Sequence, residues 1–224
     1  MPNIKQYNTF AELFYFPDTD YPDKAAICLN TLEEHYPDLV PDFEPFSEFV
    51  YQMSLEKLQE IYMRTFDIQA LCCMDLGYVL FGEDYTRGKI LANLNKELHQ
   101  HNIDSRCELA DRLPNVLRLL AAHKDEEFQE ELVSYLIKPA LAKMIDEFKP
   151  ARLQKKEHIY QKFHHTFLEK KDAYINKYLL PLHTLNEMVN RDFPELETVE
   201  VGNENDFMDS VKSEFKNQKK KNKF

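Results

Sequence analysis

The chain has 224 residues and a net charge of −11, with 43% apolar and 30% charged residues, as in a single soluble domain. This acidic balance disfavours nucleic acids and anionic membrane surfaces as partners and is compatible with a basic peptide. The sequence offers neither an uncharged apolar stretch of membrane-spanning length nor a signal peptide, and its four cysteines lack CxxC spacing. We therefore expect a cytoplasmic protein with reduced thiols and no membrane insertion.

The four glycines and the long stretches of 3.6-residue apolar periodicity predict an all-α fold. The helices predicted in the first part of the chain cover residues 10–16, 23–36, 45–53, 55–67 and 69–81. Thr9 is expected to cap the first helix, Ser54 caps the fourth, and Pro22 suits the first turn of the second. The stretch 69–81 is apolar almost all round, which predicts a buried central helix with Asp75 inside it.

In the remainder of the chain, the predicted helices cover residues 85–102, 115–123, 125–148 and 151–189. A polar loop, 102–112, precedes Pro114, which lies near the start of a helix. Asp125 is expected to cap the helix that follows, and Pro139 should kink or break it near Leu136. Pro181 should kink or split the final helix.

Beyond Pro194 the sequence becomes acidic and then basic, ending in KNQKKKNKF. Such a segment cannot bury enough apolar surface to fold alone. We therefore expect a single-domain helical bundle over residues 1–194 and a mostly disordered tail over 195–224.

Three of the glycines fall in GYVLFGEDYTRG, residues 77–88, and two of them have the spacing of a phosphate-binding loop. The acidic Glu83 and Asp84 stand where phosphate would sit, and this disfavours a nucleotide site. The sequence instead predicts that Gly82 closes one helix, that Asp84 caps the next, and that Gly88 allows close helix packing.

The sequence lacks the motifs of common enzymes and metal sites, among them HExxH and GxSxG. Neither His99 and His101 nor His164 and His165 form a ligand set by spacing, so we expect no catalytic residue, metal or cofactor. Asp75 is the unusual ionisable group because of its apolar surroundings. A partner such as Arg64 or Arg87 is the favoured interpretation, and a peptide-binding role is the alternative.

Four segments have a specific order and spacing: FAELFYFPDTDYPD, LEKLQEIYMRTFDI, LGYVLFGEDYTRGKILANL and ELADRLPNVLRLLA. Together with KPALAKM they cover residues 10–148 and resemble the nitrate reductase delta-subunit (NarJ-type) molybdoenzyme assembly chaperones, relatives of TorD and DmsD. The matched positions include Leu58, Gln59, Tyr62, Thr65, Phe66, Asp67, Tyr78, Gly82, Arg87, Gly88, Glu108, Asp111 and Pro114. The chain departs from the family at Arg112, where relatives usually carry histidine.

The resemblance implies an all-helical chaperone without enzymatic activity. Its partner would be the apo catalytic subunit of a molybdoenzyme, with nitrate reductase the expected client, held by its N-terminal leader until the molybdenum cofactor is inserted. The candidate leader-binding residues are Glu108, Asp111, Arg112, Asp67, Tyr62, Phe66, Asp75 and Arg87, and the candidate structural residues are Gly82, Asp84, Gly88 and Pro114.

Alternatives remain open for several of these residues. Glu108 and Asp111 either contact a basic leader or stabilise their own loop. Tyr62 and Phe66 fit the core better than direct peptide contact. Asp67 either caps the next helix or pairs with the leader. A general helical adaptor, unconnected with molybdoenzymes, is the alternative function.

Overall fold

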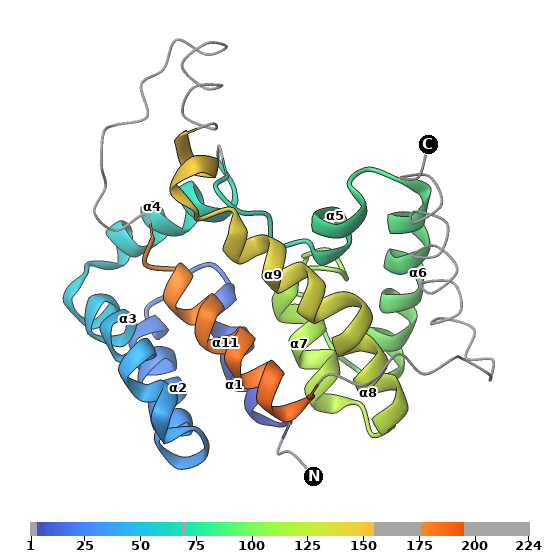
Figure 1. The fold of residues 1–224 in the computed structure, drawn as a ribbon, viewed down its shortest axis with the longest axis horizontal. Coiled ribbons are helices and arrows are strands. Elements are labelled where there is room, and N and C mark those ends of the chain that lie inside the picture. Colours follow the sequence, from blue (N-terminus) through green and yellow to red (C-terminus); the bar gives the residue numbers. More distant parts are fainter. Residues whose placement is uncertain (1–3, 69, 155–175, 195–224) are drawn as a thin grey trace.

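The computed structural model describes residues 4–68, 70–154 and 176–194 (Figure 1). The elements in chain order are α1 (Gln6–Ala11), the 3-10 turn η1 (Glu12–Phe14), α2 (Tyr21–His35), the 3-10 turn η2 (Pro37–Leu39), α3 (Val40–Gln52), α4 (Leu55–Phe66), α5 (Leu76–Phe81), α6 (Tyr85–Gln100), α7 (Leu113–Ala122), α8 (Glu126–Leu132), the π-helical turn η3 (Val133–Ile137), α9 (Lys138–Asp146) and α11 (Leu179–Asp192). The all-α prediction is thus confirmed for the described residues. None of their helices combines the length and apolar character needed to cross a membrane.

The predicted helix starts are confirmed where a short polar side chain precedes the helix. Ser54, Asp84 and Asp125 each accept a hydrogen bond from a backbone N–H two or three residues further on. Pro22 and Pro114 lie in the first turns of α2 and α7, where a missing N–H costs nothing. Local capping rules therefore suffice to set these helix starts.

The predicted helix over 69–81 is wrong in its first half, because α5 begins only at Leu76. The preceding residues 70–75 are not helical, and their backbone hydrogen bonds go to other parts of the chain. The Cys72 N–H donates to Thr65 O at 3.0 Å, and Met74 O accepts from the Leu113 N–H at 2.8 Å. Asp75 is therefore not inside a helix; it occupies the N-cap position of α5.

Two further helix starts differ from prediction. Thr9 lies within α1, which begins at Gln6, so it caps nothing. The third helix starts at Val40 rather than Pro45, which lies inside it. Because Pro45 has no N–H, the carbonyl of Pro41 lacks its usual helical donor within α3.

The kink or break predicted near Leu136 takes the form of a change in helix type ahead of Pro139. The π-helical turn η3 separates α8 from α9, and Pro139 lies in the first turn of α9. Pro181 lies in the first turn of α11, so the predicted helix over 151–189 is split ahead of it. Much of that predicted helix, with His158, His164 and His165, lies outside the described residues, as does the predicted tail over 195–224.

The last helix, α11, crosses the middle of the bundle between α3 and α9 (Figure 1). Just before it, the ring of Tyr178 packs 4.9 Å from Phe66, 5.9 Å from Tyr62 and 5.6 Å from Phe46, measured between ring centroids. The Tyr178 hydroxyl lies 3.1 Å from that of Tyr21. All five rings are buried, so aromatic packing joins α2, α3 and α4 to the C-terminal part of the bundle.

A second buried contact fixes the other end of α11. Asp192 Oδ2 accepts hydrogen bonds from the hydroxyls of Tyr7 and Tyr36, both at 2.6 Å, and from Gln6 Nε2 at 3.2 Å. We call these four residues the Asp192 network. It joins the first and last described helices to the end of α2.

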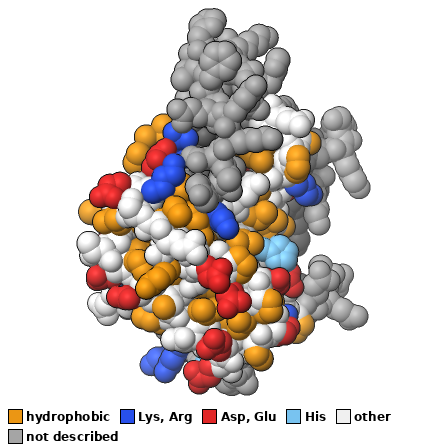
Figure 2. Space-filling model, turned by 90° about the vertical axis from the view of Figure 1, so that its left-hand side faces the viewer, with side chains coloured by type: hydrophobic (Ala, Val, Ile, Leu, Met, Phe, Trp, Pro, Cys, Tyr) orange, Lys and Arg blue, Asp and Glu red, His pale blue; other side chains and the backbone are white. Residues whose placement is uncertain are grey.

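Acidic side chains are spread over the surface as well as gathered at particular sites. Helices α2, α3 and α4 lie on the left of Figure 1, and Figure 2 views the molecule from that side. Hydrophobic side chains there lie among acidic ones. The negative net charge is therefore partly a general property of the surface, and a binding site has to be argued from a local arrangement.

Candidate functional site

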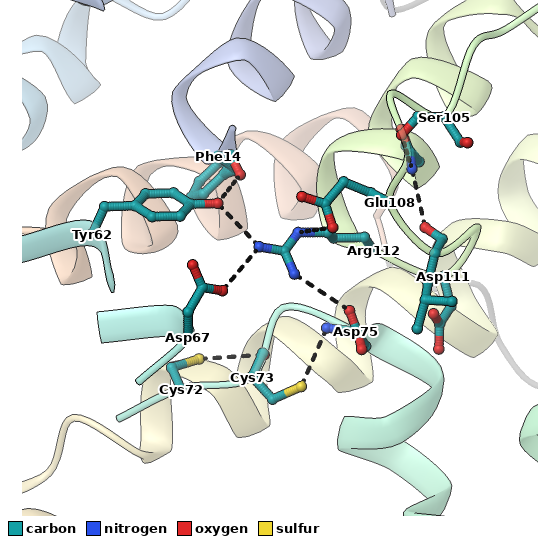
Figure 3. Close-up of polar contacts among 12 residues, drawn as sticks. Phe14, Tyr62, Asp67, Cys72, Cys73, Asp75, Ser105, Glu108, Asp111 and Arg112 are labelled. Atoms are coloured by element: carbon teal, nitrogen blue, oxygen red, sulfur yellow. Dashed lines mark hydrogen bonds and ion pairs between the residues drawn. The ribbon is translucent and has the colours of Figure 1, made fainter. Parts of the chain in front are cut away.

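An extended contact holds the starts of α5 and α7 side by side (Figure 3). Asp75 and Arg112 form an isolated antiparallel bridge. The Leu76 N–H donates to Asp111 O at 2.8 Å, and the Leu113 N–H donates to Met74 O at the same distance. These backbone bonds bring the side chains at 75, 111 and 112 to one place, although about 35 residues separate them along the chain.

Arg87, in the first turn of α6, pairs with two of these side chains. Its Nε lies 2.9 Å from Asp111 Oδ2 and its Nη2 lies 2.9 Å from Asp75 Oδ2. The Asp111 side chain is fully buried, whereas Asp75 is 18% exposed. Burial raises the pKa of Asp111 above its usual value, although the Arg87 guanidinium favours the charged carboxylate. Arg87 therefore holds a carboxylate that water does not reach.

Arg112 forms the outer half of the same cluster. Its Nη2 donates to the Tyr62 hydroxyl at 3.1 Å and to Asp67 Oδ1 at 3.3 Å. Its Nη1 lies 3.8 Å from Asp75 Oδ1, and its Nε lies 3.4 Å from Glu108 Oε2, close enough for an ion pair but outside hydrogen-bond geometry. Arg112 thus joins the end of α4, the start of α5 and the loop before α7 (Figure 3).

Acidic groups outnumber basic ones in this cluster. The carboxylates of Asp67, Asp75, Glu108 and Asp111 surround the guanidiniums of Arg87 and Arg112, which leaves two negative charges in excess when all four acids are ionised. We call these six residues the carboxylate–arginine cluster. Its two outer carboxylates, Asp67 and Glu108, are 39% and 37% exposed.

Apolar side chains are exposed beside the outer carboxylates. Ile68 follows Asp67 and is 58% exposed, and Leu109 follows Glu108 and is 49% exposed. The Phe16 ring packs edge-on against Tyr62, with ring centroids 5.6 Å apart, and is 47% exposed. The surface around the cluster therefore combines negative charge with apolar contact area.

The loop over 102–112 is held by residues that the sequence did not single out. Asn115 Nδ2 donates to Leu109 O at 3.0 Å and to Ser105 O at 3.2 Å, and Asn115 Oδ1 accepts from the Tyr15 hydroxyl at 2.8 Å. Arg118 Nη1 donates to Asp104 O at 2.6 Å. An asparagine among the mostly apolar residues of α7 is the signal that could have found this support.

The loop also contains unusual backbone geometry and an outer ion pair. Arg106 and Cys107 have φ values of 54° and 64°, in the region that favours glycine. The Arg106 guanidinium makes a two-point contact with Glu12 at 2.7 and 2.9 Å. The loop conformation is thus fixed by side-chain contacts to α7 and η1, and this fixes Glu108 at its rim.

Gly77, Gly82 and Gly88 have different structural roles. Gly82 closes α5 at a φ of 66°, as predicted. Gly88 is exposed and a Cβ there would meet no described heavy atom within 4 Å, so the prediction of close packing at this glycine is wrong. Close contact occurs instead at Gly77, where a Cβ would lie 2.7 Å from Asp111 Oδ2. Glycine at 77 therefore leaves the room that the Arg87–Asp111 pair occupies.

Most candidate residues from the sequence lie together. Six of them make up the carboxylate–arginine cluster, and the seventh, Tyr62, contacts it through its hydroxyl. Phe66 is separate because its ring packs in the core against Tyr178. Asp111 was expected either to contact a leader peptide or to stabilise its loop. Its buried pairing with Arg87 fits the stabilising role. Asp67 is the C-cap residue of α4 and does not cap α5, which begins at Leu76.

Comparison with known proteins assigns no family to this chain. No protein-family model matches the sequence, and no curated protein matches it either. The fold and the cluster define an all-α protein with an acidic, apolar-rimmed surface site.

Proposed function

We propose that the protein is a chaperone that binds a basic peptide segment of a client at the carboxylate–arginine cluster. Following the resemblance of its sequence, we further propose that it acts in the cytoplasm and that the client is the apo catalytic subunit of a molybdoenzyme, nitrate reductase. The chaperone would hold the client's N-terminal leader while the molybdenum cofactor is inserted. The observation that carries the proposal is the excess of carboxylates over guanidiniums beside exposed apolar side chains.

The cluster suits a peptide that carries arginine or lysine next to apolar residues. Asp67 and Glu108 each share Arg112 with other acids, and both reach solvent, so an incoming guanidinium can pair with them. Ile68 and Leu109 offer apolar surface within the same region. The negative net charge of the chain adds long-range attraction that speeds association with a basic peptide.

The segments that carry the resemblance also supply the cluster. Tyr62 and Asp67 come from the second segment, Arg87 from the third, and Asp111 and Arg112 from the fourth. These segments meet at one place in the fold, which supports a shared role (Figure 3). Because Arg112 replaces the usual histidine, the peptide preference of this chain should differ from that of relatives.

Calorimetric titration with the N-terminal peptide of a nitrate reductase catalytic subunit from the same genome tests the proposal. Glu108→Gln combined with Asp67→Asn should weaken binding by about tenfold, since each exposed charge pair contributes up to about 1 kcal/mol. Glu33→Gln, an exposed acid on α2, is the matched control and should leave the affinity within about twofold. The folded state of each variant is checked by circular dichroism.

Two results would contradict the proposal. Absence of binding by the wild-type chain would exclude the leader as its ligand. Equal binding of the leader and of a scrambled peptide of the same composition would remove the dedicated client and favour the general adaptor.

A further inference from the structure

Two parallel helices end beside each other on the far side of the bundle from the carboxylate–arginine cluster. At their starts, Arg87 of α6 contacts Asp111, two residues before α7. At their ends, His101 follows α6 and His123 follows α7, and the two imidazole rings lie 4.7 Å apart. The C-terminal ends of both helices therefore face the same point.

A carboxylate completes the group. Glu97 lies one helical turn before His101, so both side chains project from the same face of α6. Its Oε2 lies 3.8 Å from His123 Nε2, and one ligand atom from each of Glu97, His101 and His123 lies within 4.8 Å of the others. All three residues are partly buried, and the side chains of His123 and Glu97 are 13% and 15% exposed.

Two contacts hold His123 in place. Its ring stacks on Phe128 of α8, with centroids 3.9 Å apart and an interplanar angle of 21°. The Asp125 N–H donates to its Nδ1 at 3.2 Å, so the other nitrogen, Nε2, faces Glu97. The ring is thus oriented before any ligand arrives.

We propose that Glu97, His101 and His123 form a binding site for a divalent transition-metal ion, with Zn²⁺ as the preferred metal. Two imidazoles and one carboxylate are an established zinc ligand set, and it leaves a fourth position for water. A cation is also favoured where the negative ends of two helix dipoles meet. The inference goes beyond the proposed peptide-binding function and does not depend on it.

The distances among the three ligands also bear on how tightly the metal is expected to bind. Zinc-bound nitrogens lie about 2.0–2.1 Å from the metal, so the three side chains must move slightly closer together. Ligation through His123 Nε2 places the ring proton on Nδ1, so the hydrogen bond that Nδ1 accepts from the Asp125 N–H must be given up. These adjustments predict an affinity in the micromolar range rather than that of a tight structural zinc site.

Sequence spacing did not reveal this group, and the sequence-based expectation was that no metal site exists. His101 was considered with His99, two residues away on the chain, but His99 is exposed and is not one of the three grouped ligands. The third ligand comes from the end of the next helix. Only the parallel arrangement of α6 and α7 brings it within reach.

Calorimetric titration of the full chain with ZnCl₂, after treatment with a chelator that is then removed, tests the proposal. We expect a micromolar site that loses at least tenfold in affinity in His101→Gln and in His123→Gln. Glu97→Gln should weaken binding by a smaller factor. His99→Gln, which removes the neighbouring exposed imidazole, should change the affinity less than twofold.

Substitution with Co²⁺ supplies an independent measurement. Wild type should show visible absorption of a four- or five-coordinate cobalt site, and His101→Gln should lose it. Added Zn²⁺ should raise the melting temperature of wild type, because the ion binds the folded state, and should not raise that of the variant. Should His123→Gln fail to fold, His101→Gln and Glu97→Gln still decide the question.

The proposal is overturned if wild type shows no zinc binding at millimolar concentration. It is equally overturned if the His101→Gln and His123→Gln double variant binds as tightly as wild type, because the ion then sits on other histidines. A loss in His99→Gln as large as that in His101→Gln would also reject the assigned ligands.

Discussion

The Asp192 network and the carboxylate–arginine cluster both join distant segments through carboxylates, but their donors and acceptors are balanced differently. Asp192 is a single acceptor that receives three donors, two of them buried tyrosine hydroxyls. In the cluster, four carboxylates share two guanidiniums, and two of the acids reach solvent. In the first arrangement the carboxylate already receives three donors, whereas the second has capacity for a further cation.

The four carboxylates of the cluster differ in how far they are buried, and this separates structural acids from acids that can bind a partner. Asp111 is fully buried and contacts Arg87 directly, so it serves the fold. Glu108 and Asp67 are more than one-third exposed and share their partner, so they are available for binding. An aspartate or glutamate is therefore assigned to structure or to binding by how many donors surround it and how much water reaches it.

Replacing the cation at the buried end of the cluster should have the largest effect. Arg87→Met leaves Asp111 buried without its partner, and we expect a loss of about 3–5 kcal/mol in the free energy of unfolding, measured in urea. Arg64→Met is the control, because Arg64 pairs with Glu60 on the exposed surface of α4, and it should lose less than about 1 kcal/mol. A loss at Arg87 as small as at Arg64 would contradict the assignment of Asp111 to structure.

Removing the acceptor of the Asp192 network should have the next largest effect. Asp192→Ala leaves the hydroxyls of Tyr7 and Tyr36 without their acceptor, and we expect a loss of about 2–4 kcal/mol in urea unfolding. Asp38→Ala removes an exposed acid that pairs with Arg191 of α11, and it should cost less than about 1 kcal/mol. Equal losses in the two variants would mean that the network adds no more than a surface ion pair.

The two glycines next to the cluster offer a matched pair. Gly77→Ala places a Cβ against Asp111, which Arg87 holds fixed, and should destabilise the fold by about 1–3 kcal/mol. Gly88→Ala meets open space inside a helix and should stabilise it by about 0.5–1 kcal/mol. Opposite shifts in melting temperature check the pair, and shifts of the same sign would show that the contact at Gly77 is easily relieved.

Alkaline pH should weaken the Asp192 network before it affects the arginines. Burial first, and then the Asp192 carboxylate, raise the pKa of Tyr7 well above its usual value. The folded chain therefore keeps this proton where the unfolded chain loses it, and stability falls as the pH rises above about 10. One such tyrosine contributes a slope of about 1.4 kcal/mol per pH unit.

Tyr7→Phe should reduce that slope by one proton, measured by urea unfolding at several pH values above about 9. Tyr51→Phe, whose ring is 84% exposed, should leave the slope unchanged. An unaltered slope in Tyr7→Phe would show that other tyrosines dominate the alkaline response.

Local rules predicted the parts of the fold that depend on neighbouring residues. The caps at Ser54, Asp84 and Asp125 need only a short polar side chain ahead of a helix, and all three are confirmed. The helix predicted from residue 69 failed because a short run of buried apolar residues does not by itself specify a helix. Residues 70–75 are not helical, and the backbone of Met74 and Leu76 bonds instead to the chain around Arg112.

The residues of the candidate site were predictable from the sequence, but the burial of each side chain was not. Asp75 was the one charged residue singled out by its apolar surroundings, and Arg87 was among the partners expected for it. The loop residues Glu108 and Asp111 were candidates through the family resemblance. The sequence did not show that Asp111 is buried while Glu108 is exposed, since both lie in one polar loop. Asn115 and Gly77 escaped notice because their roles exist only once α1, α5, α6 and α7 have assembled.

The Asp192 network also bears on the order in which the chain can mature during synthesis. Tyr7 and Tyr36 leave the ribosome well before Asp192, whose carboxylate accepts their hydroxyl hydrogen bonds. Until residue 192 emerges, Tyr7 and Tyr36 lack this acceptor, and α11 cannot pack fully against α3 and α9. Contacts of such long sequence separation form late. The bundle should therefore close only after residue 192 has emerged.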